Sequence, residues 1–215
     1  MATEIGLRER KKQRTRQLLA DTARRLFSER GFENVSVAEI ARVAEVSQAT
    51  VFNYFPTKED LVYSGLEAFE ESLFAAIRER PGGQTVLDAF RDFILAARGF
   101  LAADDETKAE ELVAVTRMIA ASSALLAREQ KIFARTTDAL AELIAKDTGA
   151  GPTDISPHVV ANALIGVHRA LIAYVRQRLE AGTPARSRLA RDVRERGEQA
   201  FALLAAGLDE YAPKR

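Results

Sequence analysis

Apolar residues recur at helical spacing along most of the 215-residue chain. They fall three or four positions apart, which places them on one face of a helix and gives it an amphipathic character. This spacing is found in residues 18–27, 61–77, 86–102, 110–121 and 125–145. Alternating runs bounded by hairpin turns, the pattern typical of strands, are absent from the sequence. The pattern therefore predicts an all-α protein of about nine helices.

Residues that start or stop helices divide this pattern into elements. Gly31, followed by Phe32, is typical of a helix C-terminus with a hydrophobic closing contact. Ser156-Pro157 combines an N-cap residue with proline in the first turn, so we expect a long helix from there to about Ala181. A last helix is expected over about 186–211. A helix from Thr57 to about Ile77 is expected to join the N-terminal part to the rest.

Three helix starts lie between residues 36 and 58. Ser36 with Glu39 has the spacing of a capping box, and Thr57 with Asp60 repeats this spacing after a proline. Ser47 supplies another N-cap between them. Two short helices joined by a tight turn, followed directly by a third helix, are typical of a helix-turn-helix.

The second of these short helices, residues 48–55, is predicted to be the recognition helix. The turn before it lies at residues 44–46. From helical periodicity we expect Val51, Phe52 and Phe55 to face the core, and the polar residues between them to face outwards.

Residues 46–61 read Val-Ser-Gln-Ala-Thr-Val-Phe-Asn-Tyr-Phe-Pro-Thr-Lys-Glu-Asp-Leu. They closely resemble the DNA-binding core of the tetracycline-repressor (TetR) family, in which Val-Ser-x-x-Thr-hydrophobic-aromatic-x-Tyr-Phe-x-x-Lys-x-x-Leu is the signature. The similarity extends upstream over residues 23–32 and covers about the first 65 residues. It implies a DNA-binding domain at 1–56 and a ligand-binding and dimerisation domain at 57–215.

Glu45 departs from this family, which usually has glycine in the turn. If the turn needs a positive φ, a side chain there costs on the order of 1 kcal/mol.

The candidate DNA contacts lie on or beside the two short helices. Gln48 and Asn53 can hydrogen-bond to base edges, and the Ala and Thr between them can contact a thymine methyl group. Tyr54 and Lys58 are expected to hold phosphates. The full predicted DNA-binding set is Ser36, Val37, Ser47, Gln48, Ala49, Thr50, Asn53, Tyr54 and Lys58.

The first 16 residues carry six basic and two acidic side chains, although the whole chain balances 31 basic against 31 acidic residues. The overall balance argues against a general polyanion binder. The basic segment is either a solvated terminus or, directly ahead of a helix-turn-helix, an arm that lies along phosphates or enters a minor groove.

The sequence offers no constellation for catalysis. There is no cysteine and only two histidines, without His-carboxylate metal spacing, a phosphate-binding glycine loop or a nucleophile elbow. We expect no enzyme activity, no cofactor and no metal site. No apolar run approaches the roughly 20 residues that span a bilayer, and no secretory leader is evident, so a cytoplasmic protein without a membrane partner is expected.

The second domain contains candidate residues for a small-molecule effector. Most aromatic residues there are expected to be core, and a single histidine in a helix is more often a satisfied core residue than a ligand. Arg117 lies on an otherwise apolar helix, and either extends to water or presents its guanidinium to an anionic ligand. The predicted ligand-binding set is Phe69, Phe93, Phe100, Arg117, Met118, Phe133 and His168.

Residues 116–127 and the helix after them resemble the C-terminal domain of the mycofactocin-type branch of TetR regulators. That resemblance implies an acyl-CoA-like effector. Ala124 stands where the branch often has proline.

The last two helices carry small residues on one face. These are Ala163, Gly166, Ala170 and Ala173, with Ala200, Leu204, Gly207, Leu208 and Tyr211 on the other helix. Small residues allow close helix approach, either within the chain or between two copies. The family resemblance implies a homodimer in which the last two helices of each chain form a four-helix bundle.

These observations together predict a ligand-responsive transcriptional repressor. It would bind a palindromic double-stranded DNA operator as a homodimer and be released by a small-molecule effector, with the helix from Thr57 as the lever. The alternative is a helical ligand-binding or adaptor protein without specific DNA recognition, supported only by Glu45. An enzyme that uses the helical pocket is a third reading.

Overall fold

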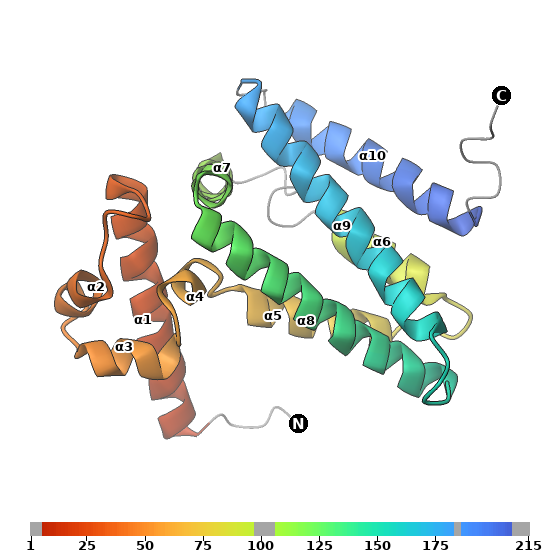
Figure 1. Cartoon of the computed structure of the whole chain (residues 1–215), viewed down its shortest axis with the longest axis horizontal. Coiled ribbons are helices and arrows are strands. Elements are labelled where there is room, and N and C mark those ends of the chain that lie inside the picture. The colour runs from red at the N-terminus through yellow and green to blue at the C-terminus, as the bar shows by residue number, and fades with distance from the viewer. Residues whose placement is uncertain (1–5, 97–105, 183–185, 208–215) are drawn as a thin grey trace. The chain divides into compact units, whose positions relative to one another are not determined.

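The computed structural model describes residues 6–96, 106–182 and 186–207 (Figure 1). All regular secondary structure in these ranges is α-helical, which confirms the predicted all-α class. The ten helices of the described ranges are α1 Leu7–Arg30, α2 Val37–Val43, α3 Gln48–Tyr54, α4 Lys58–Val62, α5 Leu66–Arg78, α6 Val86–Leu95, α7 Glu106–Ala121, α8 Ser123–Thr148, α9 Ser156–Glu180 and α10 Arg186–Ala205.

The expected single helix from Thr57 to Ile77 is wrong, because it is divided into α4 and α5 by a turn at residues 63–65. Gly65 lies in this turn, and glycine is a poor helix former. The hydroxyl of Tyr63 donates a hydrogen bond to the carbonyl of Leu125 at 2.9 Å, which ties the turn to a distant segment. Apolar periodicity carries no information on such a contact.

The three predicted caps in the helix-turn-helix region form. The Ser36 hydroxyl accepts from the N–H of Glu39 at 3.2 Å, and the Ser47 hydroxyl accepts from the third residue beyond it at 3.0 Å. At Thr57 both halves of a capping box are present. At Ser36 only the first half forms, because the Glu39 carboxylate pairs with Arg30 instead.

The start of α9 differs from the prediction by one position. Ile155, not Ser156, is the N-cap residue, and Pro157 lies in the first turn. The carboxylate of Asp154 accepts a hydrogen bond from the Ser156 N–H at 2.8 Å. Hydrogen bonds from Ser156 lower the pKa of Asp154 below its ordinary value.

The chain forms two compact units. The first contains residues 1–67 and 118–128, and the second contains 68–117 and 129–215. The core of the first unit includes Leu19, Leu26, Phe27, Ile40, Val51, Phe55, Leu61 and Leu125, each at most 2% exposed. The end of α7 and the start of α8 therefore belong to the same packed unit as the helix-turn-helix.

The second unit is a helical bundle in which α9 and α10 lie side by side (Figure 1). Its core includes Leu73, Ile77, Phe90, Leu140, Leu164, Leu189 and Phe201. Gly197 allows α10 to approach α6, because a Cβ at that position would lie 2.5 Å from Cδ2 of Leu95. Ala200 and Leu204 of the predicted small-residue face pack against this core. Leu208 and Tyr211 lie outside the described residues.

Helix α8 belongs to both units. Its first six residues, through Arg128, group with the helix-turn-helix, and the remainder lies in the second unit. Helix α8 is therefore a second connection between the units, besides the one expected from Thr57.

Candidate DNA-binding surface and effector site

The recognition helix α3 has one buried and one exposed side. Val51 and Phe55 are 0% and 1% exposed, as predicted, whereas Gln48, Ala49 and Asn53 face outwards. Phe52 is 45% exposed, so its predicted core position is wrong. Position 52 follows position 48 by four residues, which places both on the same outer face. Phe52 thus joins the candidate DNA-contacting surface.

Two of the predicted contacts, Ser36 and Ser47, cap helices. The hydroxyls of Ser47 and Thr50 lie 2.8 Å apart, and the Ser47 hydroxyl also caps α3. Ser36 is exposed at the start of α2, with Val37 half-buried beside it. Tyr54 is half-buried at the end of α3. These residues share the helix-turn-helix, and the structure leaves the exposed Gln48 and Asn53 as its main polar groups.

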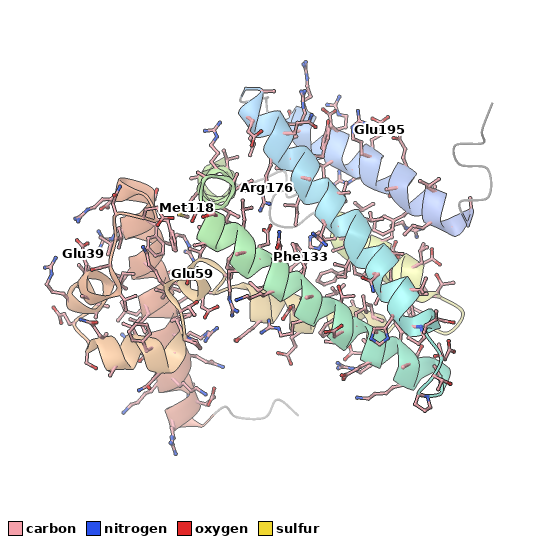
Figure 2. All side chains as sticks on the ribbon, viewed as in Figure 1. Glu39, Glu59, Met118, Phe133, Arg176 and Glu195 are labelled. Atoms are coloured by element: carbon pink, nitrogen blue, oxygen red, sulfur yellow. The ribbon has the colours of Figure 1, made fainter. Side chains whose placement is uncertain are left out.

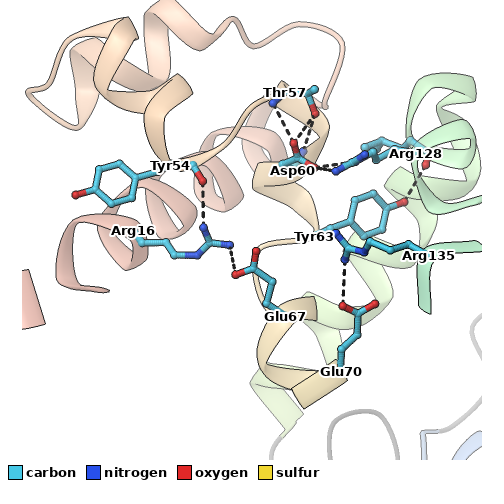
Figure 3. A network of polar contacts seen from close by, with 10 residues as sticks. Arg16, Tyr54, Thr57, Asp60, Tyr63, Glu67, Glu70, Arg128 and Arg135 are labelled. Atoms are coloured by element: carbon cyan, nitrogen blue, oxygen red, sulfur yellow. Dashed lines mark hydrogen bonds and ion pairs between the residues drawn. The ribbon is translucent and has the colours of Figure 1, made fainter. Parts of the chain in front are cut away.

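Arg16 holds the end of the recognition helix in place (Figure 3). Its guanidinium donates to the carbonyl of Tyr54 at 3.0 Å, pairs with Glu67 at 2.9 Å and lies 4.6 Å from the ring centroid of Phe55. A cation at a helix C-terminus satisfies a free carbonyl and complements the helix dipole. Sequence reasoning counted Arg16 only as part of a basic segment.

The basic segment is helical rather than an extended arm, because α1 begins at Leu7. An open hollow of about 730 Å³ lies between the first turns of α1 and the end of α3. It is lined by Arg8, Glu9, Lys11, Lys12, Thr15, Asn53 and Tyr54. The basic side chains thus lie beside the recognition helix, where they can meet phosphates.

Lys58 contacts aromatic rings of the first unit. Its ammonium nitrogen lies 4.2 Å from the ring centroid of Phe32 and 6.0 Å from that of Phe27, which is cation–π geometry. The two rings also contact each other. Lys58 therefore packs over the two rings that lie beside it.

Glu45 adopts the left-handed conformation that its turn requires, with φ +56°. The following Val46 N–H donates to the Ala41 carbonyl at 2.9 Å, so the turn is formed with a non-glycine residue. The conformational free-energy cost expected for Glu45 is thus confined to this turn. The recognition helix after this turn is formed, with its cap at Ser47 in place.

The first unit contains a polar network that connects α4 with the start of α8 (Figure 3). Arg128 Nε donates to Asp60 Oδ1 at 2.7 Å. The other carboxylate oxygen of Asp60 completes the capping box with Thr57. Ser122 donates to Glu33 at 2.7 Å. Sequence analysis did not predict the Asp60–Arg128 pair, because its partners are 68 positions apart.

Four of the seven predicted effector residues lie together in the second unit. The ring of Phe69 on α5 lies 5.3 Å from that of Phe93 on α6 and 5.8 Å from that of His168 on α9, measured between centroids. Phe133 on α8 meets His168 edge-on at 5.9 Å. Figure 2 shows Phe133 projecting from α8. We call Phe69, Phe93, Phe133 and His168 the aromatic cluster.

The remaining predicted effector residues are not in this cluster. Arg117 on α7 is exposed, which favours the alternative in which it extends to water. Met118 groups with the first unit and is half-buried. Phe100 lies outside the described residues.

Two carboxylates of the second unit form ion pairs between helices. Arg176 on α9 forms two hydrogen bonds with Glu129 on α8, at 2.6 and 2.9 Å, and both side chains are less than one fifth exposed. Glu70 on α5 pairs with Arg135 and accepts a hydrogen bond from Thr136 on α8. Within the ranges that the structure describes, no group of three His, Asp or Glu residues could hold a metal ion.

Two family models match the chain. Residues 19–63 match "Bacterial regulatory proteins, tetR family", and residues 84–209 match "MftR C-terminal domain". The regulator TcmR of Streptomyces glaucescens is 32% identical over 147 residues, covering 67% of this chain and 65% of TcmR. MftR of Mycobacterium tuberculosis, named as a regulator of mycofactocin biosynthesis, is 28% identical over 165 residues, covering 77% of this chain and 80% of MftR.

Solved structures share the fold. NalD, a secondary repressor of a multidrug efflux pump in Pseudomonas aeruginosa, aligns with a TM-score of 0.53 at 20% identity, covering 87% of this chain and 97% of NalD. SmeT in complex with triclosan aligns with a TM-score of 0.55 at 18% identity, covering 90% of each chain. With the matched family models over both units, these findings show that the chain belongs to the TetR family of bacterial transcriptional regulators and carries an MftR-type C-terminal domain.

Proposed function

We propose that this regulator is a repressor that binds a palindromic operator as a homodimer and leaves the operator when a small-molecule effector binds. The observation that carries the DNA-binding part is the outer face of α3. Gln48, Ala49, Phe52 and Asn53 are exposed there, on a helix fixed at its start by the Ser47 cap and at its end by Arg16. A fixed helix with exposed amide side chains suits the major groove.

The contacts fall into two kinds. Gln48 and Asn53 can pair with base edges, and the exposed ring of Phe52 can contact a thymine methyl group. Lys58 and the basic side chains of the hollow beside Asn53 would hold phosphates without regard to sequence. Specificity would thus depend on α3, while overall affinity would depend on the surrounding cations.

The proposed dimer uses α9. Gly166, Ala170 and Ala173 are exposed on this helix, and Val159 is 58% exposed. Contrary to the expectation from sequence, α9 is by length and composition apolar enough to cross a membrane. We assign its exposed apolar face to pairing with a second copy, because an isologous dimer presents two recognition helices to two half-sites about 34 Å apart.

The effector would bind at the aromatic cluster in the second unit. The resemblance to the mycofactocin-type branch implies an acyl-CoA-like molecule, and SmeT, which shares the fold, has been solved as a complex with triclosan. Helix α8 supplies Phe133 to the cluster and Arg128 to the first unit. A ligand that binds more tightly to one position of α8 would therefore shift the position of the recognition helix. By linkage, operator DNA must weaken the binding of that ligand by the same factor by which the ligand weakens DNA binding.

The experiment is a mobility shift with the promoter region beside the protein's own gene, compared with random DNA. Gln48→Ala should cost roughly 1–3 kcal/mol on the specific site alone. Lys58→Ala should weaken binding to both DNAs. It should also reduce the slope of the logarithm of the binding constant against the logarithm of salt concentration by about one unit. Equal losses on specific and random DNA for both variants would contradict the assignment of contacts. No preference of the wild type for the promoter would contradict the proposed function.

A further inference from the structure

His168 is enclosed by aromatic rings from other helices. The ring of Phe69 is stacked on it at an interplanar angle of 29°, and Phe133 meets it at 88°. His168 and both phenylalanines keep partial exposure, although Leu73, Leu140 and Leu164 on the same three helices are buried. The aromatic cluster therefore has one partly exposed side, from which the proposed effector would approach the imidazole.

The nitrogens of this imidazole form no hydrogen bond within the part of the chain that the structure describes. Throughout the ranges that the structure describes, His168 makes ring contacts but no hydrogen bond or ion pair. Neither nitrogen is among the buried side-chain atoms that lack a partner in these ranges, so the imidazole is open to solvent on the partly exposed side of the cluster. A core histidine kept for structure alone would be expected to bond to a neighbouring carbonyl or hydroxyl.

The imidazole is also uncharged under ordinary conditions. Loss of hydration in this environment lowers the pKa of His168 from 6.5 to about 4. A neutral imidazole offers one N–H donor and one bare nitrogen acceptor. Such a group can bond to a hydroxyl, amide or carbonyl but gives no counter-charge to an anion.

We propose that His168 is the specificity-determining group of the effector site, and that the part of the effector that enters the aromatic cluster is flat, apolar and uncharged, with one hydrogen-bonding group. This inference rests on the proposed function, since it concerns the same effector. The rings of Phe69 and Phe133 would hold the flat body, and an imidazole nitrogen would bond to its polar group. Any negatively charged part of an acyl-CoA-like effector would lie outside the cluster.

The test uses three probes of nearly the same shape. These are 2-naphthol, which carries a neutral hydroxyl, 2-methylnaphthalene, which carries none, and 2-naphthoate, which carries an anion. Each is titrated calorimetrically into the full-length protein without DNA. Wild type should bind 2-naphthol about tenfold more tightly than either of the other two, the effect of one neutral hydrogen bond.

His168→Phe retains an aromatic ring and removes both nitrogens. It should bind 2-methylnaphthalene as wild type does and lose the tenfold preference for 2-naphthol. His168→Gln keeps a donor and an acceptor, so it should retain a preference for 2-naphthol while losing the ring contacts. It also serves as the second variant if His168→Phe does not fold.

Three outcomes would overturn the inference. An undiminished preference for 2-naphthol in His168→Phe would show that another group supplies the hydrogen bond. Tighter binding of 2-naphthoate than of 2-naphthol to wild type would indicate an anion site, for which the exposed Arg169 beside Phe133 is the obvious cation. Binding of none of the probes would show that the cluster does not admit flat apolar molecules. Operator binding of wild type, measured without probe, reports on the proposed function separately.

Discussion

Arg128 and Glu129 are consecutive residues of α8, yet their ion pairs lie in different units. Arg128 bonds to Asp60 in the first unit at 2.7 Å, and Glu129 bonds to Arg176 in the second at 2.6 Å. Asp60 also completes the cap of α4. A single turn of α8 therefore carries one bond to the helix that follows the recognition helix and another to α9, the helix proposed for dimerisation.

Replacing Arg128 with alanine should destabilise α4. Asp60 is 13% exposed and would lose its charged partner, so we expect the local free energy of unfolding to fall by about 1–2 kcal/mol. Amide hydrogen exchange of α3 and α4 measures this directly. Arg25→Ala is the control, because its pair with Glu29 is about half exposed and should be worth less than about 0.5 kcal/mol. Equal effects of the two variants would contradict a special role for Arg128.

Gly166→Leu should disrupt the dimer while preserving the fold of each chain. Apart from the adjacent backbone of α9, a Cβ at position 166 meets no atom within 4 Å, so a side chain can be added there unless a second copy lies against it. Sedimentation should show at least a tenfold weaker dimer. Lys131→Leu adds a similar apolar side chain at an exposed position of α8 and should leave the dimer intact. If Gly166→Leu still forms the wild-type dimer, the interface lies elsewhere.

Glu45→Gly should be more stable than Glu45→Ala by about 1 kcal/mol. Both variants remove the carboxylate, but only glycine adopts the φ of +56° without a steric cost. Comparing the two variants with each other excludes the effect of the lost charge. Urea denaturation, followed through hydrogen exchange of α2 and α3, measures the difference in the free energy of unfolding between the two variants. Identical stabilities would show that the turn has relaxed away from the left-handed region.

Stability at acidic pH should depend on His168. The folded protein keeps this residue neutral down to about pH 4, whereas in the unfolded chain it gains a proton near pH 6.5. Between these values the unfolded state binds more protons than the folded state. The stabilising effect of neutral His168 is therefore full above pH 6.5 and is lost as the pH falls towards 4. Wild type should therefore lose up to about 3 kcal/mol more than His168→Phe over this range.

Denaturant unfolding at several pH values measures this difference. All other ionisable groups are the same in the two proteins, so their effects cancel in the comparison. Parallel pH profiles for wild type and His168→Phe would show that His168 is not buried in its neutral form.

The helical class, the caps of the helix-turn-helix and the family resemblance could all be obtained from the sequence. Each depends on residues within a few positions of one another, such as Ser47 and the N–H three residues later, and local spacing determines local hydrogen bonds. Periodicity placed Val51 and Phe55 in the core for the same reason. It misplaced Phe52, because apolar character alone does not show which side of a short helix is covered.

The tertiary structure decided what lies between distant residues. Asp60 and Arg128 are 68 positions apart, and Phe69 and His168 meet only when α5 and α9 pack together. The division of the expected long helix into α4 and α5 likewise accompanies a bond from Tyr63 to Leu125. Sequence by itself therefore determined the helical class and the caps of the helix-turn-helix, because propensity and capping act locally. Packing decided which charged and aromatic side chains meet, because such pairs arise only when separate helices come together.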